Sequence, residues 1–132
     1  LRGCVGRMDA AESLGVTVAE VARSAALADP RFRPVSEHEL SGVEVSVSVL
    51  TPAESMDVGS YDELLRTVRP GVDGLVVDSG RHRATLLPAV WENLPDVHDF
   101  LAALWRKAGL PPNAWPAGTV VSRYRAQEAS EV

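Results

Sequence analysis

The alternation of apolar and polar residues is clearest at positions 43–50, where it predicts a strand. Every second residue in this segment is a valine, and Glu44, Ser46 and Ser48 lie between the valines. Successive side chains of a strand point to opposite faces, so the valines share one face and the polar residues share the other. A strand with one apolar and one wetter face is typical of antiparallel or mixed sheets.

A helix is predicted over residues 17–28, where apolar residues recur at intervals of three and four. Its first residue and Glu20 stand at the spacing of a capping box, in which a hydroxyl and a carboxylate bond to free backbone N–H groups. Pro30 disfavours helical geometry in the residue before it and therefore ends the helix. The same capping-box spacing recurs at Ser36 and Glu39, which predicts a shorter helical turn.

The remaining elements complete an α+β pattern. They are a helix at about residues 60–68, strands at 72–77 and 83–87 around a turn at 78–80, a helix at 96–108, and a last strand at 119–124. Gly109 ends the longer helix, because glycine readily adopts the left-handed conformation found at such ends. We expect one α+β domain at residues 1–126, with helices packed on a mixed or antiparallel sheet. Residues 127–132 are expected to fray.

The composition is that of an ordinary globular protein, with 45% apolar and 23% charged residues. No apolar run approaches the roughly 18 residues of a membrane span. The net charge of −5 argues against broad contact with nucleic acid or anionic membranes, although it leaves a local basic pocket open. A single cysteine excludes an internal disulfide and indicates a reducing compartment. Since the first residues also lack a signal-peptide pattern, we expect a cytoplasmic protein.

The first six residues, Leu-Arg-Gly-Cys-Val-Gly, are the strongest candidate for a chemical site. Gly3 and Gly6 bracket Cys4, so the backbone can turn sharply or approach a ligand there. In an extended segment Arg2 and Cys4 project from the same face, where a guanidinium favours the nucleophilic thiolate. Alternatively, Cys4 is a small buried apolar side chain, since no base or metal-ligand partner accompanies it in the sequence.

Two other arginine-containing segments are candidates for anion binding. At positions 29–34, Arg31 and Arg33 flank Phe32 between two prolines. This pattern predicts either a rigid anion-binding corner or a connector with Phe32 in the core. Arg83 follows the predicted hairpin turn, where it either contacts phosphate or points into solvent.

Metal and phosphate motifs are missing from the sequence. The three histidines are far apart and have no neighbours at ligand spacing, so we expect no metal site. The chain also lacks a glycine-rich phosphate-binding loop and a serine nucleophile elbow. No cofactor is therefore expected.

Matching stretches along the whole chain carry a resemblance to a known family. They are LRGCVG at residues 1–6, DPRF at 29–32, EVSVSVLTP at 44–52, RPGVDGL at 69–75, ATLLPAVWE at 84–92, and KAGL at 107–110. In these stretches the sequence resembles the AMMECR family, in particular its bacterial form, AmmeMemoRadiSam system protein A. The LRGC-x-G element followed about two dozen residues later by DPRF is the most specific feature.

The resemblance implies an α+β fold in two lobes with a cleft, and a functional site at the LRGC-x-G element. That element corresponds here to Arg2, Gly3, Cys4 and Gly6. Family members carry a helix and a strand before it, so we expect this chain to be truncated at its amino end. They occur beside, or fused to, a Memo-type protein and a radical S-adenosylmethionine enzyme, and a role in RNA modification has been proposed for them.

Two functions remain open at this point. One is an enzyme, or enzyme component, that modifies RNA or a nucleotide with Cys4 as nucleophile or acid–base thiol and Arg2 as its activator. Arg31 or Arg83 would then hold phosphate. The other, which we favour, is a noncatalytic binding component of the Memo-type and radical-enzyme system. The lack of a base beside Cys4 argues against autonomous catalysis, and the acidic charge argues against a large RNA footprint.

Overall fold

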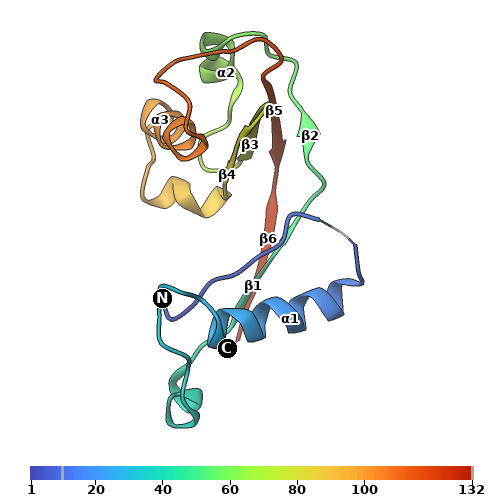
Figure 1. Ribbon diagram of the computed structural model, residues 1–132, viewed down its shortest axis with the longest axis vertical. Coiled ribbons are helices and arrows are strands. Elements are labelled where there is room, and N and C mark those ends of the chain that lie inside the picture. The colour runs from blue at the N-terminus through green and yellow to red at the C-terminus, as the bar shows by residue number, and fades with distance from the viewer. Residues whose placement is uncertain (10, 132) are drawn as a thin grey trace. The chain divides into compact units, whose positions relative to one another are not determined.

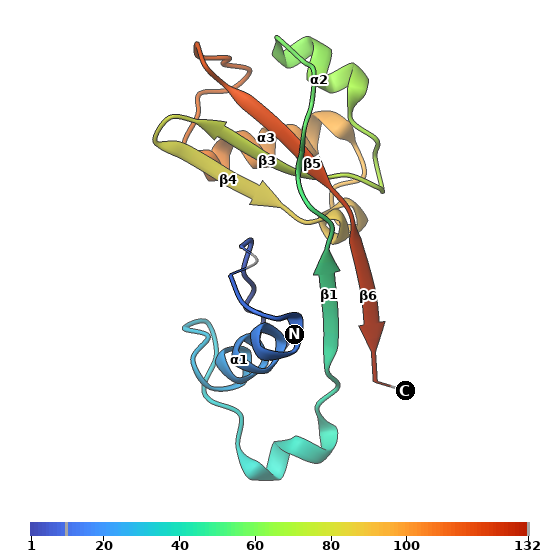
Figure 2. The same cartoon turned by 90° about the vertical axis from the view of Figure 1, so that its right-hand side faces the viewer.

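The computed structural model describes residues 1–9 and 11–131, and the chain divides into two compact units. The first unit comprises residues 1–48 together with the end of the chain from Glu128, and the second comprises residues 49–127. The first contains α1 (Leu14–Leu27) and the 3-10 helix η1 (Glu37–Gly42) (Figure 1). β1 (Ser46–Leu50) and β6 (Ala126–Ser130) pass from one unit into the other and pair in opposite directions as a two-stranded sheet (Figure 2).

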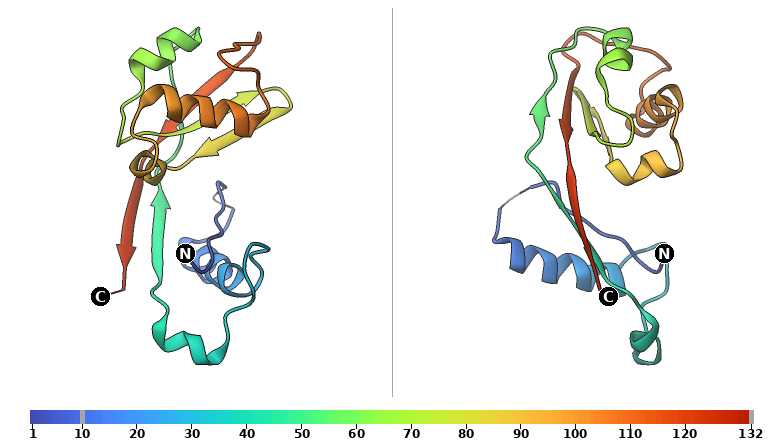
Figure 3. Two further views of the ribbon diagram at one scale, coloured as in Figure 1. Left: turned by 90° about the vertical axis from the view of Figure 1, so that its left-hand side faces the viewer. Right: turned by 180° about the vertical axis from the view of Figure 1, so that it is seen from behind.

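The second unit contains a four-stranded antiparallel sheet. Its strands are β2 (Glu54–Ser55), β3 (Gly74–Ser79), β4 (His82–Leu86) and β5 (Val120–Tyr124), in the order β2-β5-β3-β4. In β3, Val77 lies opposite Val121 of β5 on one side and Ala84 of β4 on the other. The unit also contains α2 (Tyr61–Thr67), the 3-10 helix η2 (Pro88–Glu92) and α3 (Val97–Ala108). Figure 3 shows α3 lying across one face of the sheet, so the expected α+β fold with an antiparallel sheet is confirmed.

The apolar core lies between α3 and this sheet. The side chains of Phe100 and Leu104 on α3 and of Leu75 and Val77 on β3 are fully buried. Trp91 stacks on Phe100 with ring centroids 3.7 Å apart, and its indole N–H donates to the carbonyl of Asp73 at 2.8 Å. Each large apolar side chain buried in this way contributes about 1.5–3 kcal/mol relative to exposure. The core therefore fixes the positions of α3 and of the loops that flank it.

The ends of α3 agree with the prediction from sequence. The Asp96 carboxylate accepts hydrogen bonds from the backbone N–H groups of His98 and Asp99, which caps the first turn. Gly109 has a φ of 77°, and the N–H of Leu110 donates to the carbonyl of Trp105 at 2.9 Å. This is the left-handed closure that the glycine predicts.

The hairpin between β3 and β4 is tighter than the sequence predicts. A loop was expected at residues 78–80, but Asp78 pairs with Arg83 and Ser79 pairs with His82. Gly80 has a φ of 68°, a conformation that allows a two-residue turn between paired strands. The strands therefore extend further than the polar residues near the turn indicate.

The first unit buries little of its apolar surface. Helix α1 follows Ser13, not Thr17, because the Ser13 carbonyl already accepts from the N–H of Thr17 at 3.0 Å. The predicted end of this helix before Pro30 and the capping box at η1 are both confirmed. Among the described residues of this unit only Asp29 is buried, so α1 leaves all its side chains at least partly exposed.

None of the helices in residues 1–9 and 11–131 combines the length and apolar character needed to cross a membrane.

The chain end differs from the expected frayed tail. Residues 126–130 form β6, and the N–H of Glu131 donates to the carbonyl of Val45 at 3.0 Å. Pairing with β1 satisfies backbone groups that a free tail would leave to water. The partner strand is itself shorter than predicted, since its first residue is Ser46 and not Val43. Val132 lies outside the described residues.

Candidate functional site

Arg2 of the LRGC-x-G element is held by Glu39 and by the loop before η1. Its Nε and Nη2 donate to the two carboxylate oxygens of Glu39 at 2.9 and 3.0 Å, which makes a bidentate ion pair. Nη1 donates to the carbonyl of Arg33 at 2.7 Å, and Nη2 also lies 3.5 Å from the carbonyl of Pro34. The guanidinium of Arg2 therefore anchors the first residues to η1 and to the loop before it.

Glu39 combines this ion pair with the cap of η1. Its Oε2 also accepts from the backbone N–H of Ser36 at 2.8 Å and from the Ser36 hydroxyl at 3.1 Å. The hydrogen bonds from Arg2 and then from Ser36 lower the pKa of Glu39 to about 2. One carboxylate thus satisfies a local helix cap and a contact with a residue 37 positions away.

Acid should release Glu39 from Arg2 below the ordinary titration range of a glutamate. The pKa of Glu39 is about 2 in the folded chain and about 4.3 in an unfolded one. The Arg2–Glu39 pair therefore stabilises the fold fully above about pH 4.3, and this stabilisation is lost as the pH falls toward 2. We expect the side-chain carboxyl carbon of Glu39, followed by NMR, to titrate near pH 2. In Arg2→Gln its midpoint should rise by about one unit or more. Coincident curves for the two proteins would contradict the ion pair.

Asp29 is the second anchor of the element. Its side chain is only 3% exposed, and Oδ2 accepts from the backbone N–H of Cys4 at 2.9 Å. Oδ1 accepts from the backbone N–H and from Nε of Arg31, both at 3.0 Å, and Oδ2 accepts from Nη2 of Arg31 at 2.8 Å. These donors, the Arg31 guanidinium above all, hold the pKa of Asp29 well below its usual range. The buried carboxylate therefore stays charged and fully bonded.

Arg31 closes a ring of contacts around Cys4. Its Nη2 donates to the backbone carbonyl of Cys4 at 3.1 Å, while Asp29 holds the N–H of the same residue. The guanidinium also lies 5.4 Å from the centre of the Phe32 ring. Both backbone polar groups of Cys4 are thus fixed by the Asp29–Arg31 pair, and the conformation of the motif is set without the thiol.

The two glycines of the element differ in their surroundings. A Cβ on Gly3 would overlap the carbonyl oxygen of Ala25 in α1 and lie 2.7 Å from its carbonyl carbon. A Cβ on Gly6 would meet nothing within 4 Å. Gly3 is therefore needed for the close approach of the segment to α1, whereas packing places no such demand on Gly6.

Cys4 itself is exposed, so the alternative of a buried apolar cysteine is wrong. The expected activator, Arg2, is bonded to Glu39, and the guanidinium beside Cys4 is that of Arg31. Within residues 1–9 and 11–131, no three His, Cys, Asp or Glu side chains are grouped closely enough to hold a metal ion. The site thus presents a free thiol surrounded by side chains that are already paired with one another.

The other expected ligand residues fall in different places. Phe32 is half-buried, and the Arg31 guanidinium lies over its ring, so Phe32 is not a plug in an apolar core. The role of Arg31 as an anion ligand stays a prediction. Arg83 is an exposed residue of β4, in the second compact unit. Its role as a phosphate ligand stays a prediction.

Sequence reasoning missed Asp29 and Glu39 as members of the site. Asp29 was named only as part of the 29–34 segment and the DPRF stretch, with no role of its own, and Glu39 only as a capping residue. The sequence signal available for Glu39 was local, because a capping box lies within four residues. Nothing in a single sequence links these carboxylates to partners 25 and 37 positions away.

The fold and the motif together define a class of protein. It is a two-unit α+β protein in which an amino-terminal Arg-Gly-Cys element is bonded to a buried aspartate and to a helix-capping glutamate. The sequence model of the AMMECR1 family matches residues 1–129. The chain belongs to the AMMECR1 family.

Archaeal relatives support this assignment. The chain is similar to protein MJ0810 of Methanocaldococcus jannaschii, at 42% identity over all of this chain and 67% of the relative. A protein of Methanothermobacter thermautotrophicus is 43% identical over 96% of the chain and 67% of its own length. The crystal structure of protein PH0010 from Pyrococcus horikoshii matches with a TM-score of 0.88 at 38% identity, over 99% of this chain and 65% of that one. The chain therefore spans about two thirds of the length of these relatives.

Proposed function

We propose that the chain is a noncatalytic binding component of a modification system containing a Memo-type protein and a radical S-adenosylmethionine enzyme. The observation that carries this proposal is the saturation of the polar groups around Cys4. Arg2, Arg31, Asp29 and Glu39 are all bonded to one another or to the backbone, so none is left to act as a base. A segment fixed in this way suits recognition, because a preorganised surface loses little freedom on binding.

The surface around the motif agrees with a binding role. Val5 and Met8, which follow Cys4, are 37% and 49% exposed. Contiguous apolar patches with a polar rim mark surfaces that contact another protein, and these two side chains would contribute to such a patch. The identity of the two partners rests on the resemblance to bacterial AmmeMemoRadiSam system proteins. That the chain acts in the cytoplasm rests on its single, unpaired cysteine.

The expected segment before the motif remains part of this proposal. Besides Val5 and Met8, the first unit exposes several large apolar side chains, namely Leu1, Leu14, Val16, Leu27, Leu40 and Val45. A preceding helix and strand of the kind expected from the family resemblance would have apolar surface to cover there.

Affinity capture tests the binding role directly. The tagged full-length gene product, co-expressed with the Memo-type protein and the radical enzyme of the same organism, should retain at least one of them. Cys4→Ala should retain the same partner in equal amount, because the backbone of Cys4 and not its thiol is held by Asp29 and Arg31. Capture of neither partner by the unaltered protein would overturn the proposal.

One observation favours the alternative, an enzyme or enzyme component that modifies RNA or a nucleotide through Cys4. The thiol is exposed, and the guanidinium of Arg31 is bonded to the carbonyl of the same residue. Reactive cysteines are found in partly exposed surroundings that contain cationic side chains. Modification of RNA or of a nucleotide that requires these partners and disappears in Cys4→Ala would support this alternative instead.

A further inference from the structure

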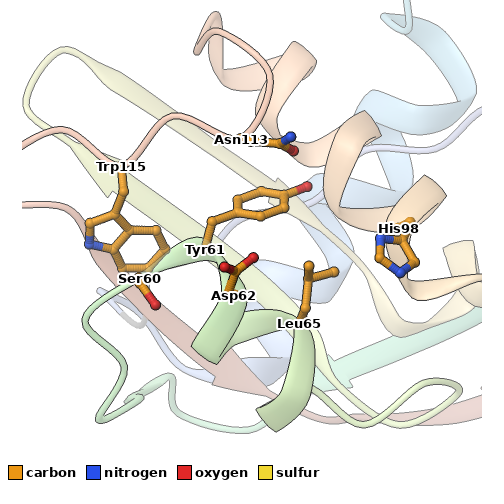
Figure 4. Close-up of a pocket in the computed structure, with 7 residues that line it drawn as sticks. All are labelled: Ser60, Tyr61, Asp62, Leu65, His98, Asn113 and Trp115. Carbon is orange, nitrogen blue, oxygen red and sulfur yellow. The ribbon is translucent and has the colours of Figure 1, made fainter.

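The second unit contains a cavity of about 460 Å³ that none of the motif residues line (Figure 4). Its walls come from the first residues of α2, from α3 and from the loop that follows α3. Figure 4 shows Trp115 and His98 at opposite ends, with the ring of Tyr61 between them. The cavity lies entirely within one compact unit.

The aromatic wall of this cavity is held by the core. Trp105 is 1% exposed, and its indole N–H donates to the carbonyl of Ala114 at 2.7 Å. Trp115 stacks against Trp105 with ring centroids 5.9 Å apart, and Tyr61 meets Trp105 edge-on at 5.0 Å. Trp115 is half-buried, so a fixed aromatic surface remains open to a ligand.

The polar wall carries one carboxylate, one imidazole and one amide. Asp62, His98 and Asn113 are exposed, and no hydrogen bond or ion pair joins their side chains to another described residue. No lysine or arginine lines the cavity. Asn113 adopts a φ of 60°, the left-handed region that asparagine tolerates better than most residues. Hydrogen-bond acceptors and an aromatic surface therefore face a common space that no lysine or arginine side chain enters.

We propose that this cavity binds the guanidinium group of an arginine side chain presented by a partner protein. A guanidinium is a planar cation that stacks on aromatic rings and donates two parallel hydrogen bonds to a carboxylate. Trp115 and Asp62 supply these two kinds of contact in one cavity. The net charge of −5 also attracts a cationic partner. A nucleobase could stack here too, but no basic side chain of the cavity would neutralise its phosphate.

Titration with capped arginine tests this site. The probe is N-acetyl-arginine amide added to the isotope-labelled full-length protein, and the readout is the indole N–H resonance of Trp115. Trp91, which is 4% exposed in the core, serves as the internal reference. We expect the Trp115 resonance to move with a dissociation constant on the order of 1–10 mM, as for a single exposed anchor side chain, while that of Trp91 stays in place.

Two comparisons make the test specific. Asp62→Asn should weaken binding at least about fivefold, whereas Glu92→Gln, an equal change of charge outside the cavity, should leave it unchanged. N-acetyl-citrulline amide, which has the shape without the charge, should bind at least about fivefold more weakly than the arginine probe. Equal binding of the two probes, no response of Trp115, or tighter binding of adenosine or guanosine monophosphate would each overturn the proposal.

Discussion

Replacing Gly3 by alanine is expected to detach the amino-terminal segment from α1. The added Cβ would overlap the carbonyl of Ala25, which is a backbone group inside a helix and cannot rotate away. Overpacking of this kind costs about 1–3 kcal/mol and sometimes more. Moving the segment outward relieves the overlap but breaks the bond from the N–H of Cys4 to Asp29.

Hydrogen exchange of the Cys4 and Arg31 backbone amides measures this detachment. Both amides donate to Asp29, and we expect their exchange to accelerate at least about tenfold in Gly3→Ala, equivalent to about 1.4 kcal/mol. Gly6→Ala is the matched control, because its Cβ would meet nothing within 4 Å. Equal exchange in the two variants would show that the close approach of Gly3 to α1 does not hold the motif.

Replacing Trp105 by alanine is expected to destabilise the second unit more than any exposed substitution. Its indole is 1% exposed, contacts Tyr61 and Trp115, and donates to the carbonyl of Ala114. Deleting a buried tryptophan or phenylalanine side chain typically costs about 3–5 kcal/mol. That is a large part of the roughly 5–15 kcal/mol by which a domain is stable.

Urea unfolding followed by circular dichroism measures this loss. The midpoint should fall in Trp105→Ala, and the free energy of unfolding should drop by about 3–5 kcal/mol. Val120→Ala in β5 is the control, since its side chain is 46% exposed and should change stability by less than about 0.5 kcal/mol. A loss below about 1 kcal/mol in Trp105→Ala would contradict the central place of this side chain in the core.

The parts of the fold that the sequence predicted are those whose signals are local. Helix α3 was predicted to within one residue, because Asp96 and Gly109 mark its two ends and both act through neighbouring backbone groups. The capping box at Ser36 and Glu39 is likewise contained in four residues. The start of α1 was wrong because two serine or threonine residues compete for the cap, and the spacing of Glu20 favoured the later one.

The candidate site was predictable in its location but not in its contacts. The glycines and the cysteine of the first six residues pointed to the right segment. The expected pairing of Arg2 with Cys4 considered only the spacing of an extended segment, whereas in the structure the Arg2 guanidinium bonds to Glu39. Contacts across 25 or 37 positions depend on the tertiary fold, which local spacing does not determine.

The central claim is that partners recognise the motif in the conformation imposed by Asp29. Isothermal titration of the full-length protein with the partner retained in affinity capture tests this claim most directly. We expect Asp29→Asn to weaken binding at least about tenfold, because it removes the charge that holds Arg31 and one acceptor of the ring around Cys4. Asp9→Asn, an exposed change of the same kind, should bind within about twofold of the unaltered protein. The claim would be contradicted if Asp29→Asn bound the partner as tightly as the unaltered protein does, while its Cys4 backbone amide exchanged faster.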